Sequence, residues 1–391
     1  MNGRPHAEEG HAPSIIERIV RDHAEQAALA WDRRDRMRWH PAYQADDVAA
    51  VEALLEDHLD GLTVAGPDAE QIVSGLLEHH PSVGDIMVAT TFAMQHDALA
   101  LLGRIEDTLR GHPAGAGGAA AALLRAAPDR GSRVATRWRS SDVPALRRAA
   151  LSADIARRSE KAIDHVRYCL RDPSPLVRAR AWRAAARFAL PVETARSPHV
   201  DDPGERAALR LWTLATDRAA SVGRDDEMFT ALGMRDTLRL LTQYGARLQA
   251  STASAWAARW RGHAHLGWYA PFVLALQGDA THVDELLAWL DDDRLNPAAG
   301  AAIAHLTGVD AVVERVLGVD VAMADRGTTP RSTLQPDDLF GPFDELPCWM
   351  GAATRQWWSA RGRAQCPSVR VLAGRPWAVA IDMEACSGTA L

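Results

Sequence analysis

The stretch that decides the fold is "RDPSPLVRARAWRAAARFAL", residues 171–190. It opens with an Asp-Pro turn at Asp172 and Pro173 and continues into a segment of helical periodicity. The small or apolar residues of that segment are Val177, Ala181, Trp182, Ala185 and Leu190. Arginines occupy much of the remaining surface. The stretch is therefore either an isolated basic helix that meets an anionic partner or one unit of a repeat.

The stretch "SDVPALRRAALSADIA", residues 141–156, has the same order of turn and helix. When Arg147 is aligned with Arg178, Asp142 falls one position beyond Asp172. This alignment predicts two equivalent turns that differ by a single residue in length. The intervening stretch "SEKAIDHVRYCLR" has its own apolar stripe and predicts a second helix, in which Cys169 is a small core residue.

Helix pairs that repeat with a period of roughly 31 residues are typical of an α-solenoid. One pair cannot bury its apolar face alone, whereas stacked pairs bury a continuous core. A degraded copy follows at residues 200–215 and a clearer one at 266–310. The abundance of alanine also favours helix over sheet. We expect an all-α solenoid of stacked helix pairs with an N-terminal helical cap and a small irregular C-terminal segment.

Changes in composition divide the chain into five parts. We expect a flexible tail, an N-terminal helical domain, a block of repeats, a loop rich in Pro and Asp, and a C-terminal segment that contains Trp. Their limits are residues 1–13, 14–127, 128–318, 319–345 and 346–391. Within the N-terminal domain, Gly61 is expected to end a helix that begins near Asp46.

The totals narrow the class of protein. The 391 residues are 47% hydrophobic, which allows a sizeable core, and the net charge of −7 argues against a nucleic-acid-binding protein overall. The four cysteines form no CxxC pair, which suits a reducing compartment. The N-terminal residues lack the order of a signal peptide, and no apolar run is long enough to span a membrane. We expect a soluble cytoplasmic protein.

The repeat units resemble HEAT repeats, in which an Asp and an Arg of neighbouring turns commonly form a ladder. Asp142, Asp172, Arg147 and Arg178 would fill those positions. Over roughly residues 20–376 the chain is also similar to a family of proteobacterial HEAT-repeat proteins of unknown function, often encoded among type VI secretion genes. The stretches that carry this resemblance are "HAEQAALAWDRRD", "EDHLDGLTVAG", "LQGDATHVDELLAWL", "AAIAHLTGVD" and "LPCWMGAATRQWW…VLAGRP". After "LAGRP" the chain departs from the family, whose members usually continue into another helix rich in Arg, Gln and Ala.

The resemblance implies a HEAT-like α-solenoid that binds proteins and has no catalytic role. It implies an accessory factor for effector loading or an immunity protein, and hence a secretion component or a toxin effector as the partner. It implies no membrane partner and no cofactor. The alternative is a HEAT-like nucleic-acid-binding protein, or an enzyme, that uses the arginine-rich segment 130–187.

That segment carries 15 Lys and Arg against 5 Asp and Glu. Its arginines are either ladder members and a solvated face, or a surface for an acidic protein or a nucleic-acid backbone. The residues chosen here as tentative protein-binding residues are Arg147, Arg148, Arg180 and Arg183.

The C-terminal segment holds three tryptophans that allow two interpretations. Trp349, Trp357 and Trp358 are either interface anchors or the core that fixes this segment to the last repeat. We favour the core and keep Trp357 and Trp358 as tentative protein-binding residues. Cys348, Cys366 and Cys386 lie in the same segment and are interpreted as isolated thiols.

The remaining motifs do not predict a chemical site. His58 and Asp60 diverge by about 200° on a helix, so His58 more simply faces the last carbonyls of a helix end. The stretches "EHH" at 78–80 and "GHAHLGW" at 262–268 lack a further ligand at a useful spacing. The glycine-rich "GHPAGAGGAA" at 111–120 follows no strand, which favours a turn over a phosphate-binding loop. We predict no catalytic residue and no metal.

Overall fold

The computed structural model describes residues 15–38, 45–157, 160–192, 201–216, 229–230, 232, 234–245, 248–309, 311, 314–317, 346–365, 371–372 and 375–376. The expected tail at 1–13 and the expected loop at 319–345 lie outside these residues. The described residues are mostly helical, so the all-α class is confirmed. The chain divides into two compact units, unit 1 (residues 1–38 and 45–181) and unit 2 (residues 39–44 and 182–391).

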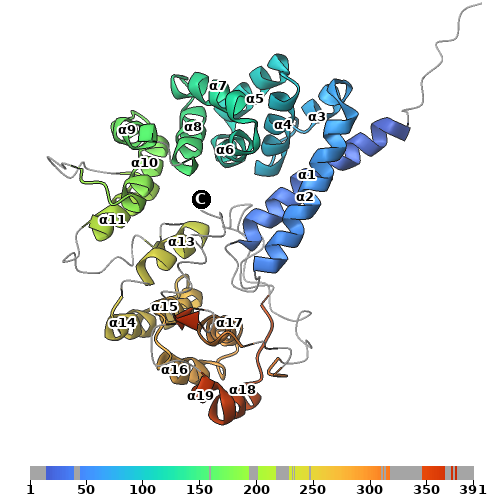
Figure 1. Ribbon diagram of the computed structural model, residues 1–391. Helices are drawn as coiled ribbons and strands as arrows, with labels where there is room; N and C mark the ends of the chain where they lie inside the picture. Colours follow the sequence, from blue (N-terminus) through green and yellow to red (C-terminus); the bar gives the residue numbers. More distant parts are fainter. Residues whose placement is uncertain are drawn as a thin grey trace, which may run out of the picture. The chain divides into compact units, whose positions relative to one another are not determined.

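Unit 1 is built from helices of 6 to 13 residues that follow a long pair at its N-terminal end (Figure 1). The long pair is α1 (Ile15–Met37) and α2 (Ala45–Ala65), which pack along each other. The others are α3 (Glu70–Gly75), α4 (Val83–Gln95), α5 (Leu99–Gly111), α6 (Ala116–Arg125), α7 (Pro128–Arg139), α8 (Pro144–Ala156), α9 (Glu160–Cys169) and α10 (Pro175–Arg187), which continues into unit 2.

Alternate helices of unit 1 pack on one another in succession. α1 packs on α4, α4 on α6 and α6 on α8, while α5, α7 and α9 each pack on α8. Close approach of these helices depends on glycine. A Cβ added at Gly84 would overlap the Ala28 carbonyl of α1, and one added at Gly118 would overlap the Val83 carbonyl of α4. The glycine-rich stretch 111–120 is therefore explained by helix packing, because its second half forms the first half of α6.

Unit 2 has the same alternation. α13 packs on α15 and α15 on α17, with α14 against α15 and α16 against α17. Its helices are α11 (Pro203–Thr216), α13 (Met234–Gly245), α14 (Ala250–Arg261), α15 (Ala270–Gln277), α16 (His282–Trp289), α17 (Asn296–Thr307), α18 (Gly351–Trp357), the π-helical turn η5 (Trp358–Gly362) and α19 (Arg363–Gln365). Two short antiparallel strands, β1 (Val371–Leu372) and β2 (Arg375–Pro376), lie in the C-terminal segment.

The segment that begins at Leu346 is fixed to α17 by one amide side chain. Nδ2 of Asn296 donates to the carbonyls of Leu290 and Trp349, at 2.7 and 2.9 Å, and the Trp349 N–H donates to Oδ1 of Asn296 at 2.7 Å. The Trp349 indole lies over Gly300, where no side chain would fit. Trp349 is therefore a core residue of unit 2, as the favoured interpretation expected.

The boundary between the units differs from the expected domain limits. It falls at residues 181–182, within α10, and not at 127–128. The reason is that helices on the two sides of residue 128 share one core: α6 packs on both α7 and α8. The expected N-terminal domain and the first repeats therefore belong to one unit.

The expected helix end at Gly61 is wrong. α2 continues through Gly61 to Ala65, and Gly66, with a φ of 68°, follows it. Gly61 instead leaves room for the ring of His23, whose atoms would lie 2.6–2.8 Å from a Cβ at this position. A glycine that marked a helix end in the sequence thus serves helix packing.

Candidate protein-binding surface

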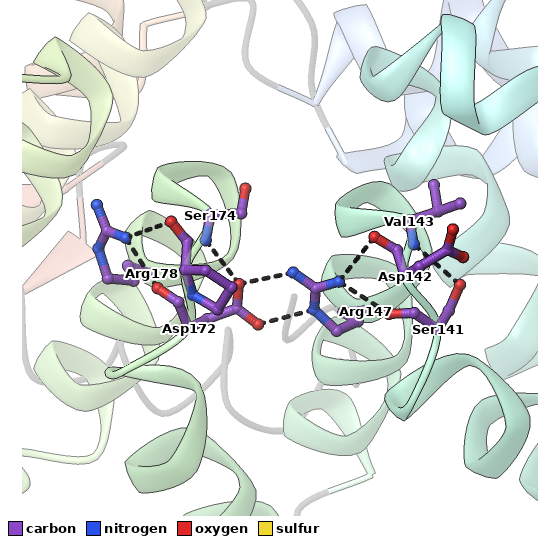
Figure 2. Close-up of polar contacts among 8 residues, drawn as sticks. Ser141, Asp142, Val143, Arg147, Asp172, Ser174 and Arg178 are labelled. Carbon is purple, nitrogen blue, oxygen red and sulfur yellow. Dashed lines mark hydrogen bonds and ion pairs between the residues drawn. The ribbon is translucent and has the colours of Figure 1, made fainter.

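The two turns that define the repeat are equivalent when Arg147 is aligned with Arg178. α8 and α10 are each 13 residues long and begin at Pro144 and Pro175. Nη1 of Arg147 donates to the carbonyls of Ser141 and Asp142, at 2.8 and 3.1 Å. The Arg178 guanidinium makes the same two bonds one unit later, to the carbonyls of Asp172 and Pro173, both at 2.8 Å (Figure 2). Each arginine thus closes the turn that precedes its own helix.

Arg147 also joins its turn to the next one. Its Nε and Nη2 atoms donate to the two carboxylate oxygens of Asp172, both at 2.8 Å, as Figure 2 shows. The side chains are 13% and 3% exposed, so this is a bidentate pair removed from water. The expected ladder contact between Arg147 and Asp172 is present. Arg147 is therefore occupied by the scaffold and is not a residue that could reach a partner.

The expected role of Asp142 in the ladder is wrong. The residue equivalent to Asp172 is Ser141: Ser141 Oγ accepts from the Val143 N–H at 3.1 Å, as Asp172 Oδ1 accepts from the Ser174 N–H at 2.8 Å. The two turns therefore have the same length. The Asp142 side chain is 84% exposed and lies 3.6 Å from Nη2 of Arg110. The sequence alignment matched two aspartates, whereas the turn requires a side-chain oxygen, which serine also supplies.

A second buried carboxylate links three helices of unit 1. Asp154 of α8 accepts from Nε and Nη2 of Arg139 at 2.9 and 2.7 Å, and Nδ1 of His165 lies 2.7 Å from its Oδ2 atom. Burial alone would raise the pKa of Asp154, but the hydrogen bonds from His165 and Arg139 outweigh it and lower that pKa. The cluster binds α7 and α9 to α8 as an ion pair.

The other tentative arginines also have partners. Nε of Arg180 donates to Ser152 Oγ at 2.8 Å, so Arg180 is held against α8. Arg148 and Arg183 are half-buried and engaged in interactions of their own. These arginines, predicted from the sequence as protein-binding residues, are therefore engaged within the protein.

The structure places a groove at a different part of the arginine-rich segment. It has a volume of about 410 Å³ and lies between the end of α4, one face of α5 and one face of α7. α5 contributes Leu99, Leu102 and Glu106, at the i, i+3, i+7 spacing of one helical face. The residues that line the groove are Ala93, Met94, Asp97, Leu99, Leu102, Glu106, Arg130, Arg133, Val134 and Arg137.

Three arginines of α7 line one wall of this groove at the same spacing. Arg130 donates to the carbonyls of Met94 and Gln95 at the C-terminal end of α4. Arg130 and Arg133 lie on either side of Asp97, at 3.5 and 3.7 Å. Arg137 donates to Glu106 at 2.6 Å, and the buried Trp138 donates to the other oxygen of the same carboxylate at 2.8 Å. The wall therefore holds three cations against two carboxylates.

Trp357 and Trp358 are buried in unit 2. Their exposed fractions are 8% and 4%, and both rings pack over Gly362. Nε1 of Trp358 donates to Asp284 at 3.0 Å, and Arg363 donates to both oxygens of the same carboxylate at 2.7 Å. This geometry favours the core interpretation over an interface anchor. Their tentative assignment to a binding surface is not supported.

The histidines pair with one another. His58 does not face the end of its helix: its Nδ1 atom lies 3.0 Å from Nδ1 of His23 on α1. Desolvation, and then the nearby His23, lower the pKa of His58. His80 and His112 lie 3.5 Å apart between ring nitrogens. Among the residues that the structure describes, no group of three or more His, Cys, Asp or Glu side chains could hold a metal ion.

Cys169 is an inert core thiol, as expected. It is 2% exposed, and burial raises its pKa to about 12. Because the thiolate is the reactive form, a thiol with this pKa does not react at neutral pH while the fold is intact.

Two histidines make unit 2 sensitive to acid. Burial lowers the pKa of His282, and burial lowers the pKa of His305 to about 4. The folded state therefore favours neutral rings. Their contribution to the free energy of unfolding is complete above the unfolded pKa near 6.5 and is lost as the pH falls. For His305 we expect a loss of about 1–2 kcal/mol between pH 6.5 and 5. Urea unfolding of His305→Gln at both pH values should show a smaller loss than the parent chain, whereas the exposed His265→Gln should match the parent. Equal losses in all three would contradict this assignment.

Comparisons with protein-family models, with curated proteins and with solved structures found no match to this chain. Among the helices of the described residues, none combines the length and apolar character needed to cross a bilayer. Only the geometry of the candidate surface therefore bears on what it binds. That geometry is an apolar groove with an arginine wall, on an all-α protein.

Proposed function

We propose that this chain is a non-catalytic protein-binding scaffold of stacked, HEAT-like helix pairs that serves type VI secretion. Its role is that of an accessory factor for effector loading or of an immunity protein. The resemblance of the sequence to HEAT-repeat proteins encoded among type VI secretion genes gives this proposal its biological setting. A secretion component or a toxin effector is then the partner.

The observation that carries the scaffold proposal is the repeated arginine turn. Arg147 and Arg178 make the same two carbonyl bonds in successive units, and Arg147 reaches the carboxylate of the next turn. Neighbouring units that share such a contact are held at a fixed spacing, which is what an extended binding surface requires. The succession of α4, α6 and α8 supports the same proposal.

The charges of unit 1 favour a protein over a nucleic acid as the partner. Many arginines of segment 130–187 already meet protein groups: Arg147 meets Asp172, Arg139 meets Asp154 and Arg157 donates to the Leu123 carbonyl. A nucleic-acid backbone is bound through cations that neutralise phosphates in place of counterions. Cations that are paired within the protein contribute less to such binding.

Co-purification from the native cell tests the proposed function. The tagged full chain, expressed from its own locus, should retain the product of a neighbouring secretion or toxin gene through gel filtration. An accessory factor should bind its effector together with a secretion component and leave the effector toxic. An immunity protein should abolish toxicity when it is co-expressed. If the retained proteins include no secretion component and no toxin, the assignment to secretion is wrong.

A titration with duplex DNA addresses the alternative. We expect no micromolar binding at physiological salt. Micromolar affinity with a steep loss of affinity on adding salt would favour the nucleic-acid-binding function instead.

A further inference from the structure

The groove of unit 1 has a floor suited to apolar side chains. Met94 and Leu102 are 2% and 5% exposed and close its base, while Leu99 at its rim is 71% exposed. Val134 of α7 completes the apolar lining. An exposed leucine beside such a floor is an available contact for another apolar surface.

The wall above this floor carries an excess of positive charge. Arg130, Arg133 and Arg137 follow one face of α7 and are 39%, 71% and 56% exposed. Asp97 is shared between two of them, and Glu106 is 18% exposed and already bonded to Arg137 and Trp138. Arg133, whose shared contact with Asp97 spans 3.7 Å, retains the most exposed guanidinium of the three.

An apolar floor beside a row of cations matches one kind of ligand. An amphipathic helix places apolar side chains on one face at i, i+3, i+4 and i+7, and this spacing matches the faces of α5 and α7. Carboxylates that flank the apolar face would meet the three guanidiniums, which bind carboxylates through two parallel bonds. A phosphate backbone has no apolar side chains to cover the floor of the groove, so a nucleic acid fits less well.

We propose that the groove between α5 and α7 binds an acidic amphipathic helix of a protein partner. The apolar face of that helix packs on Met94, Leu99 and Leu102, and its carboxylates pair with the arginines of α7. This inference rests on the proposed function, because it names the segment by which a partner of the scaffold is held. It assigns the recognition to unit 1 alone.

The test uses the full chain and a synthetic helix of about sixteen residues, with Leu on one face, Glu flanking it and a fluorescent label. Fluorescence anisotropy should show saturable binding. Arg133→Glu should weaken this binding about tenfold because a pair becomes a repulsion, and Leu99→Ala should weaken it about threefold or more. A helix with Lys in place of Glu should bind at least tenfold more weakly than the Glu helix.

Matched variants separate the groove from general charge and hydrophobicity. Arg167→Glu makes the same charge change on α9, where Arg167 is 55% exposed and pairs with Asp164. Leu29→Ala removes a comparably exposed leucine, 60% exposed, from α1. Both should bind the Glu helix as the parent chain does. Thermal melting of all four variants should match the parent, since each change is at an exposed side chain.

The outcomes distinguish this inference from the proposed function. If the Glu helix does not bind, or if Arg133→Glu and Arg167→Glu bind it equally, the groove inference is overturned. The same holds if the Lys helix binds as well, or if duplex DNA binds where the Glu helix does not. A secretion component that co-purifies equally with parent and Arg133→Glu chains leaves the proposed function standing and overturns the groove. Specific helix binding without any such component supports the groove and removes the link to secretion.

Discussion

Gly118→Ala is expected to destabilise unit 1 by about 2–3 kcal/mol. Alanine is the better helix former, which by itself would stabilise α6 by about 1 kcal/mol. The new Cβ, however, would overlap the Val83 carbonyl and come within 3.1 Å of the Met87 nitrogen, both backbone atoms of α4. Backbone cannot rotate away as a side chain can, so α6 must move off α4. The steric cost therefore exceeds the gain in helix propensity.

The neighbouring glycine is a matched control. Gly117 is exposed, and a Cβ there would meet Val83 Cγ1 at 3.9 Å, an ordinary contact. Gly117→Ala should stabilise the helix by up to about 1 kcal/mol, so adjacent substitutions of the same kind have opposite signs. Urea unfolding of the full chain, with hydrogen exchange measured on α4 and α6, checks both. A Gly118→Ala chain as stable as Gly117→Ala would contradict the close packing of α6 on α4.

Arg147→Ala is expected to cost about 3–5 kcal/mol. The substitution leaves the Asp172 carboxylate, 3% exposed, without its guanidinium and removes two bonds to carbonyls of the preceding turn. Burial would raise the pKa of Asp172, but bonds from Arg147 and the Ser174 N–H outweigh it and hold that pKa below its ordinary value. The contribution of this ion pair to the free energy of unfolding is therefore complete above about pH 4 and is lost only in stronger acid. In the Arg147→Ala chain this carboxylate should instead take up a proton at a higher pH.

Asp142→Ala is the control that distinguishes the two alignments of the turns. The Asp142 carboxylate is exposed and meets Arg110 at 3.6 Å, so its removal should change the free energy of unfolding by less than about 1 kcal/mol. A loss for Asp142→Ala as large as that for Arg147→Ala would show that Asp142 carries the ladder. The double variant Arg147→Ala with Asp172→Ala should lose less than the sum of the single variants, because no unpaired charge remains buried.

Much of the fold was open to prediction from local patterns. The period that aligns Arg147 with Arg178 located α8 and α10 correctly. The pairing of Arg147 with Asp172 was implied by the resemblance to HEAT repeats, and the contact is present. α15 and α17 are followed by Gly278 and Gly308, with φ values of 83° and 68°, and a glycine at the end of an apolar helix is a signal that the local sequence carries. These features depend on residues close in sequence, whose propensities act before any tertiary contact forms.

The candidate groove was not predicted. Leu99, Leu102 and Glu106 share a face of α5, and Arg130, Arg133 and Arg137 share a face of α7, so each wall had a signal in its own spacing. Nothing in either spacing indicates that the two faces oppose each other. Arg147 and Arg180, which were predicted to bind a partner, instead bond to Asp172 and Ser152 of the protein itself. Charge composition does not reveal which polar side chains lie within reach of an arginine.

By itself, the sequence determined that this protein is helical and that α8 and α10 are equivalent helices, each preceded by a turn and each with an arginine at the same position. Tertiary structure decided what those residues do: that Ser141 rather than Asp142 occupies the repeated turn, that Gly118 rather than Gly117 must be glycine, and that Trp358 is buried. The physical reason is one of range. Helix formation is set by near neighbours in the chain, whereas burial, pairing and the walls of a groove depend on segments far apart in sequence that meet only when the helices pack.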